Sequence, residues 1–114
     1  MQNHADLLEG LNSQQFKAVT HADGSLLVLA GAGSGKTKVL TTRLAWLIRT
    51  RHLGISEVLA VTFTNKAARE MLNRVGRLLH TDTKYMWVGT FHSIALRLLR
   101  AHYQEAGLPA SFQI

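Results

Sequence analysis

The sequence contains no cysteine and only one proline, and it has no long hydrophobic run. Without cysteine, a disulfide framework and any thiolate metal site are excluded. A membrane-spanning helix needs roughly 20 consecutive apolar residues, and no run approaches this length. The polar N-terminus also lacks the apolar core of a signal peptide. We therefore expect a soluble, intracellular protein with no membrane partner.

Acidic residues are scarce as well. The chain has 7 Asp and Glu against 13 Lys and Arg, and the resulting formal net charge of +6 favours a polyanionic partner. With 46% hydrophobic residues among 114, the chain can bury a core, so we expect a folded domain and not a disordered chain. The arginines lie off the apolar helical faces, where we expect solvated flanks and some contribution to a nucleic-acid surface. They are Arg43, Arg49, Arg51, Arg69, Arg74, Arg77, Arg97 and Arg100.

Short apolar runs alternate with patterns of helical spacing. The runs at 25–29, 58–62 and 86–90 predict buried strands. The helical faces are Leu40, Leu44, Leu47 and Ile48, then Ala68, Met71, Leu72, Val75 and Leu79, and finally Ile94, Ala95, Leu98 and Leu99. We expect the first of these helices to close near Gly54 and the last at Gly107, with Pro109 beyond it. The β-α-β-α-β-α order predicts an α/β fold, a parallel sheet with crossover helices.

A sheet of three strands would be thin and would have two open edges, whereas open sheets usually have four to six strands. The chain also stops at the apolar stretch 112–114, which resembles the start of another element. We therefore expect a piece of a larger domain, and a small complete domain is the alternative.

Residues 30–37 form a glycine-rich loop between the first strand and the first long helix. The loop matches the P-loop pattern Gly-x-x-x-x-Gly-Lys-Ser/Thr, with alanine in place of the first glycine. Its expected nucleotide-binding residues are Ala30, Gly31, Ala32, Gly33, Ser34, Gly35, Lys36 and Thr37. Glycines let successive N–H groups wrap a phosphate, the lysine brings charge to the β and γ phosphates, and the threonine offers a hydroxyl to Mg²⁺. An ordinary flexible turn is the alternative. The loop alone does not identify a reaction.

Three further stretches accompany the loop. They are Leu11-Asn12-Ser13-Gln14-Gln15 with Ala18-Val19, Ala60-Val61-Thr62-Phe63-Thr64-Asn65-Lys66-Ala67-Ala68, and Val88-Gly89-Thr90-Phe91-His92-Ser93. Together with residues 30–37, they resemble the UvrD/Rep group of superfamily 1 DNA helicases, and the resemblance covers residues 11–114. This family also commonly has alanine at the position of Ala30.

The resemblance implies a P-loop NTPase with a RecA-like parallel sheet. Residues 1–114 would be the N-terminal part of the first motor domain, with about 91–114 leading into an inserted subdomain. The implied activity is that of an ATP-dependent DNA helicase, an ATP hydrolase that moves 3′ to 5′ in DNA repair and replication. Its cofactors would be ATP and Mg²⁺, with Lys36 and Thr37 catalytic and Thr37 the metal ligand. Expected partners are single-stranded DNA, duplex junctions, ATP or ADP, and repair proteins, in the bacterial cytoplasm at the nucleoid.

Two residues outside the loop also receive nucleotide roles from the resemblance. Gln15 would read adenine, because an amide can donate to N7 and accept from the exocyclic amine at once. From the sequence alone, Gln15 fits equally well as the third residue of a helix capped by Asn12. Lys38 follows the loop where relatives often carry arginine, and lysine keeps the charge but lacks the planar fork.

The stretches after the second and third strands correspond to helicase motifs Ia and Ib, which contact DNA in the family. Ligands gather at the carboxyl ends of parallel strands, so Phe63 could stack on a base. Alternatively, it packs beneath the following helix, with Thr64 or Asn65 as the N-cap. The same choice applies to Phe91. The expected DNA-binding residues are Phe63, Thr64, Asn65, Lys66, Thr90, Phe91 and His92.

The sequence lacks the acidic partner that ATP hydrolysis requires. A P-loop NTPase holds Mg²⁺ from a second side with an acidic residue on a neighbouring strand. None of the seven Asp and Glu follows an apolar strand as an Asp-Glu pair. We therefore expect this chain alone to bind ATP without hydrolysing it, and to self-associate through exposed sheet edges. A stand-alone nucleotide-binding module without turnover is one alternative. A small-molecule kinase is another, although an arginine-rich lid is missing.

Overall fold

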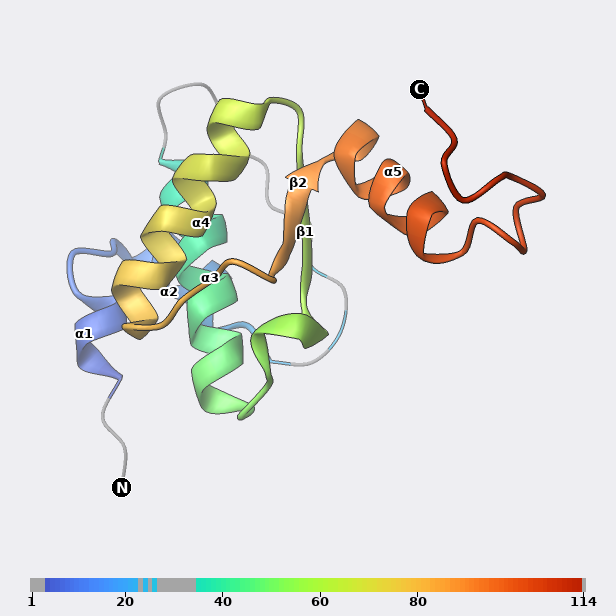
Figure 1. Cartoon of the computed structure of the whole chain (residues 1–114). Helices are drawn as coiled ribbons and strands as arrows, with labels where there is room; N and C mark the ends of the chain where they lie inside the picture. The colour runs from blue at the N-terminus through green and yellow to red at the C-terminus, as the bar shows by residue number, and fades with distance from the viewer. Residues whose placement is uncertain (1–3, 23, 25, 27–34, 114) are drawn as a thin grey trace.

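The computed structural model describes residues 4–22, 24, 26 and 35–113. Except for residue 26, the expected strand at 25–29 lies outside this described set, and so do loop residues 30–34. Within it, helices and strands alternate in the predicted order from α3 onward (Figure 1). The elements are α1 (Ala5–Leu8), α2 (Ser13–Thr20), α3 (Lys36–Thr50), η1 (Ile55–Glu57), β1 (Leu59–Thr62), α4 (Asn65–Leu79), β2 (Trp87–Thr90) and α5 (Phe91–Ala101).

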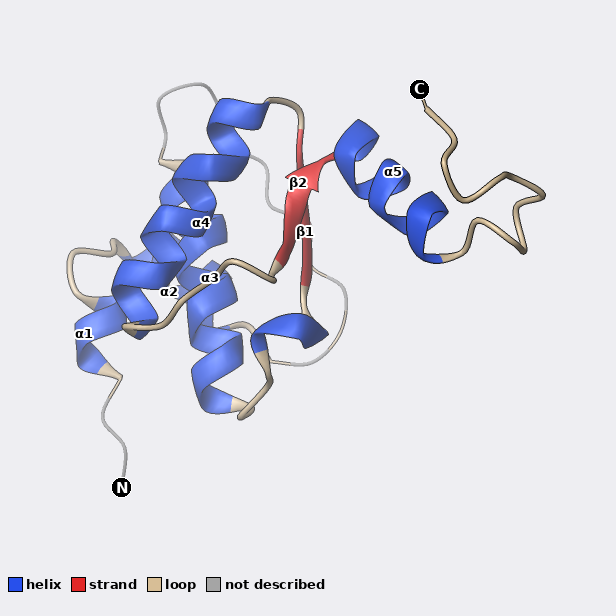
Figure 2. Cartoon of the chain, in the orientation of Figure 1, coloured by secondary structure: helices blue, strands red, loops and turns tan. Residues whose placement is uncertain are grey.

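The two described strands pair in parallel, which confirms the predicted strand direction. Leu59 lies opposite Trp87, and Thr62 lies opposite Thr90. Helix α4 makes the crossover between them, as a parallel pair requires. Figure 2 shows α3 and α4 together on one side of the strands, while α5 leaves the end of β2 in the other direction. The described part of the chain is therefore a mixed α/β structure with a small parallel sheet.

The core lies where α3 and α4 meet the strands. Its buried centre consists of Ile48, Met71, Val75 and Met86. Burial of each such side chain contributes roughly 1.5–3 kcal/mol, so this cluster holds the helices on the sheet. From the predicted faces of α3 and α4, the residues that lie in this cluster or pack against it are Leu44, Ile48, Met71, Leu72, Val75 and Leu79. Leu40 is an exception, since its residue is 57% exposed although the helical pattern placed it on the apolar face. The predicted face of α5 lies outside the cluster: Ile94 is buried, but Ala95 is exposed and Leu98 is 46% exposed.

Two helices end before the glycines that were expected to close them. Helix α3 ends at Thr50 because His52 adopts the left-handed conformation (φ 52°) and Leu53 N donates to Ile48 O at 3.0 Å. Histidine is among the residues that enter this region more often than most, so Gly54 is not needed as the cap. Helix α5 ends at Ala101, and residues 102–107 continue as turns.

In the described ranges, every helix is too short or too polar to cross a membrane.

Candidate nucleotide and nucleic-acid site

The first turn of α3 carries the described part of the glycine-rich loop. Gly35 precedes the helix with φ 82° and ψ 22°, a left-handed conformation that side chains rarely adopt. Lys36 and Thr37 follow it and are exposed. The unpaired N–H groups at a helix start and the positive end of the helix dipole both attract anions. An ammonium group, a hydroxyl and a helix N-terminus are therefore gathered at one place.

Gln15 lies beside this helix start. Its Oε1 accepts from Asn12 N at 3.1 Å, and its own N–H donates to Asn12 Oδ1 at 2.8 Å, which confirms the helix-capping interpretation. A Cβ atom at Gly35 would lie 3.2 Å from Gln15 Nε2, so the amide nitrogen faces the end of the loop. Because an amide has two N–H donors and two acceptor lone pairs, capping leaves capacity for adenine recognition.

Two basic residues of α3 hold the segment that contains Gln15. Lys38 Nζ donates to Gly10 O at 3.4 Å. Arg43 Nη1 donates to three carbonyl oxygens at the end of α2, those of Ala18 (2.9 Å), Val19 (3.1 Å) and His21 (2.9 Å). Arg43 was expected on a solvated flank, and that expectation is wrong. No local sequence signal reveals these contacts, because the partners lie more than 20 residues away.

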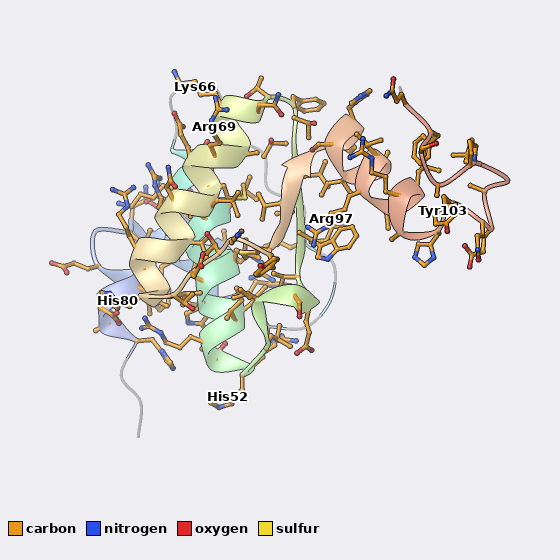
Figure 3. The ribbon with its side chains drawn as sticks, in the orientation of Figure 1. His52, Lys66, Arg69, His80, Arg97 and Tyr103 are labelled. Atoms are coloured by element: carbon orange, nitrogen blue, oxygen red, sulfur yellow. The ribbon has the colours of Figure 1, made fainter. Side chains whose placement is uncertain are left out.

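Arginines hold backbone carbonyls at two other places. Arg49 donates to Leu78 O at 3.0 Å and to the Asp6 carboxylate at 2.8 and 3.0 Å, which links α1, α3 and α4. The Arg49 hydrogen bond lowers the pKa of Asp6 below its ordinary value of 3.8. Arg97 donates to the carbonyls before β2, and its guanidinium carbon lies 3.8 Å from the centroid of the Trp87 ring (Figure 3). Arg49 and Arg97 therefore bind other parts of the chain and are not simply solvated.

The carboxyl ends of β1 and β2 bring the two predicted DNA-binding stretches together. Because Thr62 lies opposite Thr90, both strands release the chain at the same edge of the sheet. Thr64 Oγ1 accepts from Ala67 N at 3.1 Å, and Thr90 Oγ1 accepts from Ser93 N at 3.1 Å. Both threonines thus cap helices, and α4 and α5 both start at this edge, on opposite sides of the strands (Figure 1).

Two aromatic rings stand at the same edge. Phe63 is 89% exposed and Phe91 is 60% exposed. Their ring centroids are 5.5 Å apart, with an angle of 46° between the ring planes. The alternative in which these side chains pack beneath a helix is excluded for both. The short strands lead directly into the helix caps, and this geometry turns each ring outward.

A hollow of about 640 Å³ lies between the two strand ends. Its lining residues are Thr62, Phe63, Thr64, Asn65, Thr90, Phe91, His92 and Ser93. This set contains every predicted DNA-binding residue except Lys66. Figure 3 shows Lys66 projecting outward from the start of α4.

A second hollow of about 350 Å³ joins this edge to the start of α3. It is lined by Lys36, Thr37 and Leu40 of α3 and by Val61, Thr62, Phe63, Thr64, Ala67 and Met71. Thr62, Phe63 and Thr64 border both hollows. No carboxylate is among the described residues that line them. The nucleotide residues and the predicted DNA residues are therefore neighbours across residues 62–64.

The sequence matches the UvrD/REP helicase N-terminal domain over residues 11–114. It is 56% identical to DNA helicase II of Escherichia coli (strain K12) over 108 residues, which cover 95% of this chain and 15% of that relative. It is 56% identical to ATP-dependent DNA helicase UvrD1 of Mycobacterium tuberculosis (strain ATCC 25618 / H37Rv) over 94 residues, 82% of this chain and 12% of the relative. Identity to ATP-dependent DNA helicase PcrA of Bacillus subtilis (strain 168) is 49% over 108 residues, again 95% and 15%. The chain therefore spans only 12–15% of the length of these curated relatives. The chain belongs to the UvrD/REP helicase family and matches its N-terminal domain.

Proposed function

We propose that this chain is the N-terminal part of the first, RecA-like motor domain of an ATP-dependent DNA helicase. The whole protein would hydrolyse ATP to move 3′ to 5′ along single-stranded DNA in repair and replication, in the bacterial cytoplasm at the nucleoid. Residues 91–114 would lead into an inserted subdomain. The observation that carries the proposal is that residues 62–64 line two neighbouring hollows. One hollow lies beside Lys36 and Thr37, and the other contains the exposed rings of Phe63 and Phe91.

The nucleotide half of the site consists of residues 30–37 with Gln15 and Lys38. Lys36 would meet the β and γ phosphates, and N–H groups at the start of α3 would hold phosphate oxygens. The exposed Thr37 hydroxyl suits Mg²⁺, which takes oxygen ligands and usually has only one or two from protein beside phosphates and waters. When bound, the metal ion supplies positive charge between the phosphates.

The DNA half combines aromatic rings with helix starts. A base would stack on Phe63, which contributes roughly 1–3 kcal/mol, and Phe91 widens the same platform. The first N–H groups of α4 and α5 point toward the carboxyl edge, where Asn65 and His92 offer further donors to phosphates. Lys66 adds a positive charge at the rim.

The described residues support nucleotide binding without turnover in this chain alone. Phosphoryl transfer needs Mg²⁺ held from two sides and further cations on the developing charge, and no carboxylate borders the described hollows. The isolated chain would self-associate through exposed sheet edges, and Leu59 at the start of β1 is 59% exposed. Duplex junctions and repair proteins would be partners of the whole protein.

The test compares the full-length protein with the 114-residue chain in a phosphate-release assay, each with and without single-stranded DNA. We expect DNA-stimulated turnover by the full-length protein and none by the 114-residue chain. Turnover by the short chain that DNA stimulates and Lys36→Ala abolishes would contradict the placement of the active site. A full-length protein that binds ATP but never hydrolyses it would instead be a nucleotide-binding module.

A further inference from the structure

We propose that Arg43 is a positioning residue for adenine recognition. It holds the end of α2 against α3 and thereby fixes where Gln15, near the start of α2, lies relative to Gly35 and the first residues of α3. This inference rests on the proposed function, because it assigns a cause to the position of the residue that would read the base.

The contacts of Arg43 are concentrated on the end of one helix. Its Nη1 lies 2.9–3.1 Å from the carbonyl oxygens of Ala18, Val19 and His21, and the side chain is half-buried. Carbonyls in the last turn of a helix have no partner within the helix, and positive charge is favourable there. Val19 is fully buried beside them. The guanidinium therefore fixes this end of α2.

Helix α2 transmits that constraint to Gln15. It has only eight residues, so it is roughly 12 Å long and behaves as one rigid piece. The capping box with Asn12 fixes the side chain of Gln15 at the other end. There, a Cβ at Gly35 would lie 3.2 Å from Gln15 Nε2, so little displacement of α2 is needed to move the amide away from the loop.

Helix α3 connects the residues that would bind the phosphates with the residue that positions the adenine-reading amide. It begins with Lys36 and Thr37, which would hold the phosphates, and it carries Arg43 two turns later. The separation between the phosphate-binding residues on α3 and the Gln15 amide on α2 therefore depends on the contact that Arg43 makes between the two helices. The Lys38 contact to Gly10, at 3.4 Å, is a longer and weaker tether on the same segment.

A purely stabilising arginine would have a different signature. Loss of stability lowers binding of every nucleotide alike, whereas displacement of Gln15 affects only the nucleotide that uses its amide. Adenine presents an acceptor at N7 and a donor at N6, which match the amide, while guanine presents a second acceptor, O6, in place of that donor. The ratio of ATP to GTP use therefore separates positioning from stability.

The experiment measures KM and kcat for ATP and for GTP in the full-length protein that carries this chain. The variants are Arg43→Ala, Arg43→Lys, Gln15→Ala and the double variant, with Arg100→Ala as the matched control on an exposed site of α5. We expect Arg43→Ala to raise the KM for ATP about tenfold and that for GTP by less than about twofold, with kcat nearly unchanged. Arg43→Lys should recover part of the loss because it keeps the charge.

The double variant supplies the decisive comparison. If Arg43 acts through Gln15, the double variant should match Gln15→Ala alone, since the single effects cannot add. Equal changes for ATP and GTP, or additive effects in the double variant, would overturn the inference. If Arg43→Ala does not fold, Arg43→Lys and Arg43→Gln decide, and a parent-like ATP to GTP ratio in both would overturn it.

The outcome also separates this inference from the function on which it rests. A changed ratio in Gln15→Ala together with an unchanged ratio in Arg43→Ala overturns the role of Arg43 alone. An unchanged ratio in Gln15→Ala overturns the adenine role of Gln15 and the inference with it. Full ATP hydrolysis by Lys36→Ala would contradict the proposed function itself.

Discussion

The nucleotide side and the DNA side of the site are built in opposite ways. Along the first half of α3, side chains bind backbone carbonyls from distant parts of the chain, as Arg43 does at the end of α2. At the carboxyl edge of the sheet, each strand runs directly into a helix that its own neighbouring threonine caps. The rings of Phe63 and Phe91 stand exposed there, in contact with each other.

This difference follows from the tasks proposed for the two sides. A nucleotide has a base and phosphates at a fixed separation, so the groups that bind them must be held at a matching separation. A single strand of DNA presents bases and phosphates that repeat along a flexible chain, and exposed rings with local donors suffice. The nucleotide side should therefore be sensitive to small displacements, and the DNA side to loss of individual side chains.

The largest effect is expected from Lys36→Ala. Loss of a charge stabiliser at the transferred phosphate should lower the ATP hydrolysis rate of the full-length protein by about 10² to 10³. Affinity for single-stranded DNA without nucleotide should stay unchanged, because Lys36 does not border the hollow between the strand ends. Lys84→Ala, at an exposed lysine that lines neither hollow, is the control. If Lys36→Ala lowered both the ATP hydrolysis rate and the affinity for single-stranded DNA, the nucleotide side and the DNA side would not be separate.

A smaller effect, on stability and ATP binding, is expected when glycines with positive φ are replaced by alanine. Gly35 and Gly107 have φ values of 82° and 72°, so alanine should destabilise the chain at either position by roughly 1–2 kcal/mol in urea unfolding. Only at Gly35 does the added Cβ approach Gln15, whereas at Gly107 it meets open space. We therefore expect weaker ATP binding in Gly35→Ala alone. Equal ATP affinities in the two variants would show that the nucleotide side tolerates displacement.

The helix caps at the carboxyl edge should matter less. Thr64→Ala removes the side-chain oxygen that accepts from Ala67 N, which should cost about 1 kcal/mol of stability. Thr64→Ser retains that oxygen and should recover most of the loss. Hydrogen exchange at the first amides of α4 is the measurement. If Thr64→Ala and Thr64→Ser exchange alike, local capping does not organise this edge.

The smallest effect concerns Asp6. Its pKa is lowered in the folded chain by Arg49, so the pair stabilises the fold when the pH is above the unfolded value of 3.8. That contribution disappears as the pH falls through the lower folded pKa. Asp6→Asn should therefore be slightly less stable than the parent at neutral pH, and the difference should vanish below that pKa. A difference that grows on acidification would contradict the pairing.

Local patterns predicted much of the fold and part of the site. The Asn12–Gln15 capping box, the crossover by α4 and the parallel strands all follow from spacings of a few residues. The contacts of Arg43 could not be predicted, because sequence distance carries no information about which carbonyls a long side chain will reach. The exposure of Phe63 was left open for another reason. An apolar residue at a strand end is usually buried, and only the arrangement of the two helix starts decides otherwise.

The most direct measurement is the affinity of the full-length protein for a labelled oligothymidylate, by fluorescence anisotropy, in Phe63→Ala and Tyr85→Ala. Both side chains are exposed aromatics, at 89% and 68%, but only Phe63 borders the hollow between the strand ends. Loss of one stacked base, roughly 1–3 kcal/mol, predicts about 5- to 150-fold weaker binding for Phe63→Ala and less than about twofold for Tyr85→Ala. Equal affinities in the two variants would contradict a DNA site at the carboxyl edge of the sheet.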